Sequence, residues 1–377
     1  MAITPPILTL PVELLQQVFS EYDDACSAEE LFTSYDMLAL RLVCKEFNAA
    51  VFDQAAAKYL STWECCPMLP SQVDKLIRYL DTEAIASELK IVKIRMAYLE
   101  EMRYYDSECL PGEPAGARLD DLLSRIAKQG CMLDLELGQF SEHPYILEWN
   151  IETLEAVGRA KCRIQRFYLE EGAMPATGLP LDPGSKLVEA FARLRELRCE
   201  LDFASLRRAT RDSLYTVEKI TASASQLDSL RLSVKHYPRT TKYDGLATGI
   251  LLACSAENLS KLSLSEPHAE PKALMQGLHK FHGALCDLTL YGVTLLSAEE
   301  SFSKVLRVAR DMPKLNTLFV TNCKQKMAGR KWIVLWQHGA DDKKDTVLEI
   351  GRCFNGGEMR KKLDTALSRG LTLGESG

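Results

Sequence analysis

The sequence lacks the features of a membrane, secreted or nucleic-acid-binding protein. No run of apolar residues approaches eighteen, so we expect no membrane-spanning helix and no membrane partner. The first ten residues lack a basic start, and Glu13 interrupts the apolar stretch that follows, so we expect no secretory signal peptide. Positive charge is not in excess, because the net charge is -6 over 377 residues, and this argues against a nucleic-acid partner.

Sequence motifs of the common enzyme classes are absent as well. The chain contains no G-x-S-x-G, no G-x-G-x-x-G and no G-x-x-x-x-G-K-[ST] motif. His279 and His282 could share one face of a helix, but no third ligand is close in sequence, so we interpret them as surface residues. We therefore predict that the chain is not an enzyme and that it holds neither a cofactor nor a metal ion.

Cysteine is plentiful, but no two cysteines have the C-x-x-C spacing of a metal or redox site. The twelve cysteines are scattered, and we interpret the adjacent Cys65 and Cys66 as buried thiols rather than as a reactive pair. In a chain without an expected signal peptide, cysteines are best interpreted as reduced, small hydrophobic residues. This indicates a cytoplasmic or nuclear protein, and the hydrophobic content of 46% indicates a folded one.

Two short segments near the N-terminus carry apolar residues at helical spacing. In the first, Pro11 suits the first turn of a helix, and an apolar stripe follows at Leu14, Leu15, Val18 and Phe19. The second segment repeats the stripe at Leu38, Leu42, Val43 and Phe47. A unit of about 45 residues buries too little surface to be stable alone. The pair is therefore either a helical hairpin packed on the rest of the chain or a module that docks on a partner.

The order of residue types in these segments resembles the F-box, which opens with Leu-Pro-x-Glu-Leu and closes with Leu-x-Leu-Val-Cys-Lys-x-Phe. The residues that match are Leu10, Pro11, Glu13, Leu14, Val18, Phe19, Leu38, Leu42, Val43, Cys44, Lys45 and Phe47. The resemblance implies a short all-α F-box domain at residues 1–62, with an acidic insertion at 23–36, that binds a Skp-type linker protein and through it a cullin. The linker-docking residues that it implies are Leu10, Pro11, Leu14, Leu15, Val18, Phe19, Leu42, Val43 and Phe47.

A repeated pattern runs through the second part of the chain. Leu-x-x-Leu-x-Leu, with apolar substitutions, occurs seven times, and its last residue falls at Leu137, Leu169, Cys199, Leu232, Leu264, Leu290 and Val320. A fixed period near 30 residues is typical of a solenoid, and a short apolar core is typical of a buried parallel strand. Helical patterns lie between these strands at residues 118–129, 245–254, 272–281 and 298–312. Stacked strand–helix units with a parallel sheet are therefore expected.

The repeats resemble an irregular leucine-rich-repeat solenoid, which is an α/β fold with parallel strands and with helices on the convex side. Cys323 stands where that family prefers Asn or Cys, whereas Pro267 and Val293 stand there in the preceding units. Taken together with the F-box, the whole chain resembles fungal-type F-box adaptors with degenerate leucine-rich repeats. A doubly wound α/β domain is the alternative fold.

The chain can accordingly be divided into four parts. The F-box-like domain at 1–62 is followed by a helical connector at 63–117, with a candidate first strand at 89–94. The repeat region spans 118–351, and a C-terminal helix and frayed tail occupy 352–377. Within the repeat region, Trp332, Ile333, Leu335 and Trp336 predict a packing helix.

Side chains that alternate with the buried leucines of each strand should face the concave side of a solenoid. For the early strands these are charged residues of both signs, and for the late strands they are mostly hydroxyl residues. The substrate-binding face that we predict consists of Arg166, Tyr168, Arg198, Arg231, Tyr291 and Phe319. The two aromatic residues at its far end are either anchors for a protein partner or a cover for the terminal repeat.

The resemblance implies that the chain is a substrate-recognition adaptor of an SCF-type cullin–RING ubiquitin ligase. The F-box would dock on the linker, the repeats would bind a protein substrate that the sequence does not identify, and other subunits would supply catalysis. The alternative is a non-catalytic repeat scaffold for protein–protein interaction that assembles no ligase.

Overall fold

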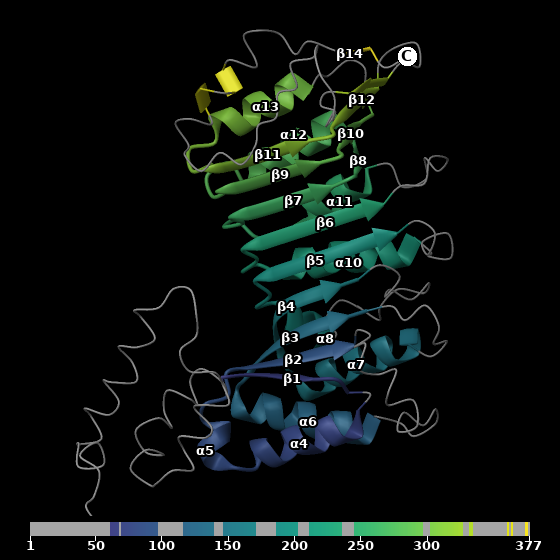
Figure 1. Cartoon of the computed structure of the whole chain (residues 1–377), viewed down its shortest axis with the longest axis vertical. Coiled ribbons are helices and arrows are strands. Elements are labelled where there is room, and N and C mark those ends of the chain that lie inside the picture. The colour runs from purple at the N-terminus through teal and green to yellow at the C-terminus, as the bar shows by residue number, and fades with distance from the viewer. Residues whose placement is uncertain are drawn as a thin grey trace, which may run out of the picture.

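A computed structural model describes residues 61–67, 69–96, 116–138, 146–170, 186–202, 211–235, 245–296, 302–326, 332–334, 360–361, 363–364 and 374–375. A nine-stranded sheet organises these residues, and every pair of neighbouring strands in it is parallel (Figure 1). Its strands, in spatial order, are β1 (Thr62–Cys65), β2 (Ile91–Met96), β3 (Met132–Leu137), β4 (Arg163–Leu169), β5 (Glu196–Asp202), β6 (Ser229–Lys235), β7 (Lys261–Ser265), β9 (Asp287–Tyr291) and β11 (Thr317–Thr321).

The spatial order of these strands is also their order along the chain. In a doubly wound sheet, later strands are added on both sides of the first strand, so the spatial order differs from the order along the chain. The order observed here excludes that alternative and supports a solenoid-like repeat. The seven strands expected from the Leu-x-x-Leu-x-Leu pattern are all present, from β3 to β11. The sheet also contains β1 and β2, which lie largely in the segment interpreted from the sequence as a helical connector, and the candidate strand at 89–94 falls at Ile91–Met96.

Helices connect the strands and stack on one another along one side of the sheet (Figure 1). They are α4 (Pro70–Leu80), α5 (Glu83–Ala86), α6 (Gly116–Gln129), α7 (Ile146–Ala160), α8 (Lys186–Phe191), α10 (Arg211–Ser223), α11 (Leu246–Ala253), α12 (Pro271–Lys280) and α13 (Phe302–Asp311). The four helices expected from the sequence correspond to α6, α11, α12 and α13. In α13, for example, Phe302, Val305 and Ala309 share one face and are buried, whereas Arg307 is exposed on the opposite face.

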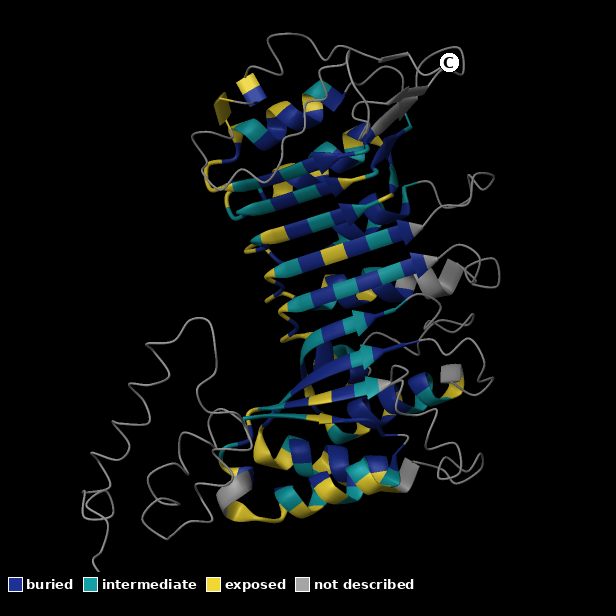
Figure 2. Ribbon diagram, viewed as in Figure 1, coloured by how far each residue is buried: buried dark blue, intermediate teal, exposed yellow. Residues whose placement is uncertain are grey.

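The core is a ladder of apolar side chains that crosses the whole sheet between the strands and the helices (Figure 2). One row of strand neighbours, each at most 2% exposed, runs through Cys65, Ile94, Leu135, Phe167, Leu197, Leu230, Leu262, Leu288 and Leu318. The rings of Phe167 and Phe191 of α8 lie 5.2 Å apart between their centroids, so strand and helix are packed by direct contact. The units therefore share one continuous hydrophobic core.

The last three complete units have a common turn after the main strand. Glu266, Gly292 and Asn322 follow β7, β9 and β11 directly, and all three have positive φ values between 55° and 61°. Each turn leads into a short strand of a second sheet, namely β8 (His268–Ala269), β10 (Thr294–Leu295) and β12 (Lys324–Lys326). Pro267, Val293 and Cys323 occupy equivalent buried positions after these turns. The structural repeat is thus more regular here than the residue types suggest.

The packing helix expected around Trp332 is wrong. Residues Trp332–Val334 form β13, which pairs antiparallel with β12 and also with β14 (Gly374–Glu375). Trp, Ile and Val all favour strands, and a short apolar run can be read at either period. The unpaired edge of β12 supplies hydrogen-bond partners, and these decide in favour of the strand. The strand β14 falls in the segment that the sequence suggested to be a frayed tail.

Candidate functional site

The side of the nine-stranded sheet that faces away from the helices carries the residues predicted to bind substrate. We call it the open face, and define it by the side chains that alternate with the buried ladder: Glu64, Lys93, Arg95, Asp134, Glu136, Arg166, Tyr168, Glu170, Glu196, Arg198, Glu200, Ser229, Arg231, Ser233, Lys261, Ser263, Ser265, Asp287, Thr289, Tyr291, Thr317, Phe319 and Thr321. Figure 2 shows the resulting alternation of buried and more exposed bands along the strands.

All six predicted substrate-binding residues lie on this face, but they do not form one compact site. Arg166 stands on β4 and Phe319 on β11, with β5, β6, β7 and β9 between them. Neighbouring strands are about 4.8 Å apart, so the two residues are roughly 24 Å from each other. The arrangement is an extended surface, which suits an elongated partner better than a small molecule.

In the early half of the open face, from β1 to β5, the charges alternate in sign across the strands. The row of register partners reads Glu64, Lys93, Asp134, Arg166 and Glu196. The guanidinium of Arg166 lies 3.6 Å from Asp134 and 3.6 Å from Glu196. One row further along the strands, the Arg95 guanidinium lies 3.4 Å from Glu64 and 3.1 Å from Glu136. The early half therefore neutralises much of its own charge.

A β-bulge helps to align these rows. Leu133 of β3 lies opposite Ile164, but Asp134 lies opposite Arg166, so Gln165 is an extra residue in β4. A bulge shifts the side chains beyond it by one position. This shift places Arg166 and Tyr168 on the open face and Phe167 in the core.

Carboxylates are crowded in the early half. Burial raises the pKa of Asp134, which the positive charges of Arg166 and Lys93 oppose. Only 5% of the Asp134 side chain is exposed, and neither of its oxygen atoms accepts a hydrogen bond within the described residues. The pKa of Glu170 is raised by burial and by the neighbouring carboxylate of Glu136, with which Glu170 shares a hydrogen bond. Ion pairs in this half thus hold together a surface with an excess of acid.

The late half of the open face, from β6 to β11, has a different chemistry. Arg231 is exposed, and no carboxylate of the described residues lies within ion-pair distance of it. Lys261 and, at the end of β6, Lys235 are further cations, and Asp287 is the single carboxylate among the described face positions of these strands. Ser and Thr hydroxyl groups occupy most of the remaining positions. Tyr291, the last residue of β9, is 38% exposed. Phe319, the third residue of β11, is half-buried.

Three charged face residues were missed at the sequence level, namely Glu64, Lys93 and Arg95. For Lys93 a signal existed, because the candidate strand at 89–94 has apolar residues at Val92 and Ile94, on either side of Lys93. For Glu64 there was none, since β1 has only four residues and no repeat pattern.

Other candidate sites carry no chemistry of their own. The rings of His279 and His282 stack with their centroids 6.5 Å apart, but the described part of the chain contains no group of three metal-ligating side chains. Cys65 and Cys66 are buried thiols, and burial raises the pKa of Cys65 to about 12, so its reactive thiolate is disfavoured. Within the described ranges, none of the helices is long and apolar enough to cross a membrane.

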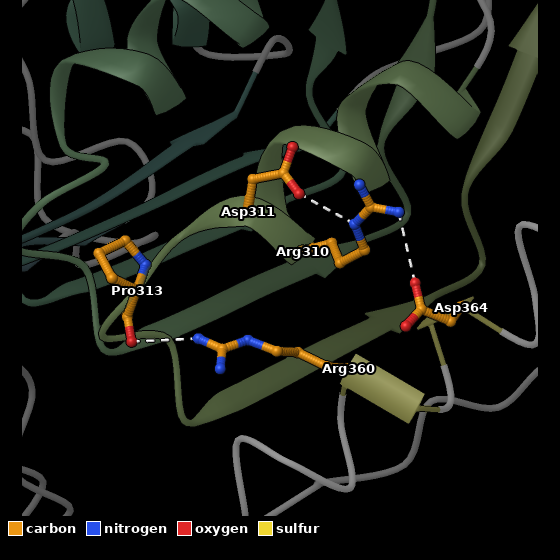
Figure 3. Close-up of a pocket in the computed structure, with 5 residues that line it drawn as sticks. All are labelled: Arg310, Asp311, Pro313, Arg360 and Asp364. Atoms are coloured by element: carbon orange, nitrogen blue, oxygen red, sulfur yellow. Dashed lines mark hydrogen bonds and ion pairs between the residues drawn. The ribbon is translucent and has the colours of Figure 1, made fainter.

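A shallow pocket at the C-terminal end of the solenoid is lined by two arginines and two aspartates (Figure 3). Arg310 pairs with Asp311 at 2.9 Å and with Asp364 at 3.3 Å. Arg360 donates hydrogen bonds to the backbone oxygens of Met312 and Pro313, at 3.3 and 3.1 Å. Leu363, which lies between Arg360 and Asp364 in the sequence, is fully buried. These contacts attach the C-terminal residues to the end of α13, and both arginines of the pocket already have partners within the chain.

Comparison with known proteins addresses the other end of the chain. Residues 7–60 match the F-box-like family. No curated protein matches the chain. The nine linker-docking residues implied by the resemblance, Leu10, Pro11, Leu14, Leu15, Val18, Phe19, Leu42, Val43 and Phe47, fall inside the matched segment and outside the described residues.

F-box domains generally bind Skp-type linker proteins, so the match supports a linker-docking module at this end and a general role in SCF-type ligases. The F-box-like segment ends at residue 60, and β1 begins at Thr62. Along the chain, the docking module and the sheet are therefore adjacent, with no room for a long linker between them.

Proposed function

We propose that this chain is the substrate-recognition adaptor of an SCF-type cullin–RING ubiquitin ligase. The F-box-like segment docks on a Skp-type linker protein and through it on a cullin, and the repeat region binds a protein substrate. One observation carries the proposal: a segment that matches the F-box-like family leads directly into a parallel sheet, and the described helices cover only one of its faces. Such a chain has one end that binds the ligase and one surface that is open to a partner.

The repeat region is, in this proposal, a degenerate leucine-rich-repeat solenoid. Its support is the Leu-x-x-Leu-x-Leu pattern, whose leucines form the buried ladder, and the parallel strands with helices on the other side. Cys323 adds to this, because its thiol lies 3.5 Å from the backbone oxygen of Leu290 in the preceding strand. That contact ties one unit to the next at the position where the repeat family prefers Asn or Cys.

The adaptor would act by proximity and not by chemistry of its own. Binding at both ends raises the effective concentration of the substrate near the ubiquitin-loaded enzyme, so the chain needs neither a catalytic residue, nor a cofactor, nor a metal ion. Seven of the eight described cysteines are buried thiols, which fits a reducing compartment. We therefore propose that the protein is found in the cytoplasm, the nucleus or both.

The test is co-purification from cells with a linker and a cullin. Replacing Leu10 and Pro11 together by alanine should abolish it, because these residues open the docking stripe. The chain offers a matched control, since Leu179-Pro180 is the same dipeptide outside the matched segment, and its replacement by Ala-Ala should leave co-purification intact.

Unchanged linker binding by the Leu10-Pro11 variant would contradict the docking claim. If the wild-type chain captures other proteins but neither a linker nor a cullin, the function is that of a repeat scaffold without ligase assembly.

A further inference from the structure

The open face differs along its length in whether its charges are available to a partner. In the early half, three arginines inside the rows of charged side chains each have a carboxylate within ion-pair distance: Arg95 pairs with Glu136, Arg166 with Glu196 and Arg198 with Glu200. A partner that binds these groups must first separate existing pairs and desolvate both members of each pair. The early half is therefore a poor place for a charged contact.

The late half has an available cation. Arg231 is exposed, and its neighbours across the sheet are Arg198 on β5 and Ser263 on β7. Arg198 is already bonded to Glu200, through two of its nitrogen atoms at 3.1 and 2.5 Å. No carboxylate of the described residues is within ion-pair distance of Arg231. A ligand that binds its guanidinium would therefore break no ion pair of the described residues.

The charge balance of the late half favours a ligand with one negative charge. Lys235 at the end of β6 has the oppositely charged Asp202 of β5 as its register partner, and the other face positions carry two cations, Arg231 and Lys261, and one carboxylate, Asp287, which gives them a net charge of +1. A phosphate group carries about −1.5 to −2 charges at neutral pH, and phosphate sites in proteins generally use clusters of arginines. A single carboxylate matches this surface better than a phosphate does.

An apolar anchor lies on the same surface. Tyr291 is one of two large hydrophobic side chains that are exposed in the described residues, and the other, Leu252, belongs to α11. Phe319 lies on the neighbouring strand, in the row next to Tyr291. Between Arg231 and these rings the strands present only Ser263, Ser265 and Thr289, whose hydroxyl groups can both donate and accept hydrogen bonds.

We propose that the substrate is an extended acidic segment, with one carboxylate bound by Arg231 and one apolar side chain held against Tyr291 and Phe319. The inference rests on the proposed function and names the class of substrate. Arg231 and Tyr291 are separated by two strand spacings and by one row of side chains, or about 12 Å in all. An extended segment rises about 3.3 Å per residue, and its successive side chains point to opposite sides. The carboxylate and the apolar residue should therefore be about four residues apart.

The experiment uses the purified full-length chain and an array of short synthetic peptides on a glycine–serine background. Each peptide carries one glutamate and one phenylalanine at varied spacing, and matched peptides replace the glutamate by lysine or phosphoserine, or the phenylalanine by alanine. The glutamate–phenylalanine peptides should bind best at a spacing of about four residues. Arg231→Glu should lower their affinity by about tenfold or more, because a charge-assisted hydrogen bond is replaced by repulsion.

The matched control is Arg307→Glu, which makes the same charge change at an exposed position of α13, on the other side of the sheet. It should leave peptide binding unchanged. The proposal is overturned if lysine peptides bind equally well, if only phosphoserine peptides bind, if no peptide binds above the Arg231→Glu background, or if Arg231→Glu binds like wild type.

Linker co-purification serves as an independent readout in the same preparations. Arg231→Glu should keep it. If the wild-type chain does not co-purify with a linker, the ligase role is contradicted but the peptide selectivity is not. Failure of the proposed function and failure of this inference are therefore distinguishable.

Discussion

The early and the late half of the open face share the same backbone and the same buried ladder, yet they differ in how they use charge. From β1 to β5, arginines and carboxylates pair with one another at 2.5 to 3.6 Å. From β6 to β11, Arg231 is without such a partner among the described residues, and Tyr291 is exposed. Position on the face therefore does not by itself make a residue a binding residue. The arginines inside the rows of the early half are held in ion pairs, whereas Arg231 in the late half has no carboxylate of the described residues within ion-pair distance.

The largest expected effects are those of core substitutions, and here the two halves should behave alike. Phe167→Ala in β4 should lower the free energy of unfolding by about 3–5 kcal/mol, and Leu288→Ala in β9 by about 2–5 kcal/mol, because both side chains are fully buried in one ladder. Urea unfolding of the full-length chain measures both. Ser263→Ala on the open face is the control, expected within about 0.5 kcal/mol of wild type. A large effect in only one half would show that the core is not continuous.

An intermediate effect should separate two arginines of the same face. Arg166→Ala should destabilise the chain by about 1–3 kcal/mol, because it leaves the buried Asp134 without its nearest cation. Arg231→Ala should stay within about 0.5 kcal/mol, since no ion pair is lost. Adding Asp134→Asn to Arg166→Ala should restore part of the loss, and unfolding of the four proteins gives the coupling energy. Equal effects of the two arginine variants would remove the distinction between the halves.

The smallest effect is a pH dependence confined to the early half. Burial raises the pKa of Asp134, so the folded chain keeps this proton to higher pH than the unfolded chain does. Its contribution to stability is present below the ordinary Asp pKa and decreases as the pH rises through the raised value. Asp134→Asn cannot ionise, so it should resemble wild type at acid pH and become the more stable protein toward neutral pH.

Urea midpoints of both proteins between about pH 4 and pH 8 measure this. The control is Asp287→Asn, the same substitution in the late half. A difference between wild type and Asp134→Asn that is independent of pH would contradict the assignment.

Much of the sheet was predictable because a buried parallel strand needs apolar residues at alternating positions. Leu230, Leu232 and Val234 of β6 are such a set, and every strand of the nine-stranded sheet from β3 onward carries one. The strand β1 was not predictable, since Glu64 and Thr62 leave only Trp63 and Cys65 as signals. Nor were α7 and α10, in which buried polar residues such as Asn150 and Thr221 interrupt the apolar period. The side-chain nitrogen of Asn150 donates a hydrogen bond to the backbone oxygen of Gly138, and the periodicity of the sequence does not reveal such a contact.

The candidate site was predictable as a face but not as a set of interactions. Alternation along a strand places Arg166, Arg198 and Arg231 on one side of the sheet. The pairing of Arg166 depends on the register between strands that are about 30 residues apart and on the extra residue Gln165 in β4, whereas Arg198 pairs with Glu200 of its own strand. Three arginines that look equivalent in the sequence therefore have different roles in the structure.

The buried cysteines have a practical consequence for observing this solenoid. Cys65, Cys162 and Cys323 lie in units at the beginning, middle and end of the sheet, and burial raises the pKa of each thiol to about 12. A thiol in that state reacts with an alkylating reagent only when its own unit opens. The alkylation rate of each buried cysteine therefore measures how often its own unit opens. Mass spectrometry of the labelled cysteines would give these rates separately for each unit, with and without a bound partner.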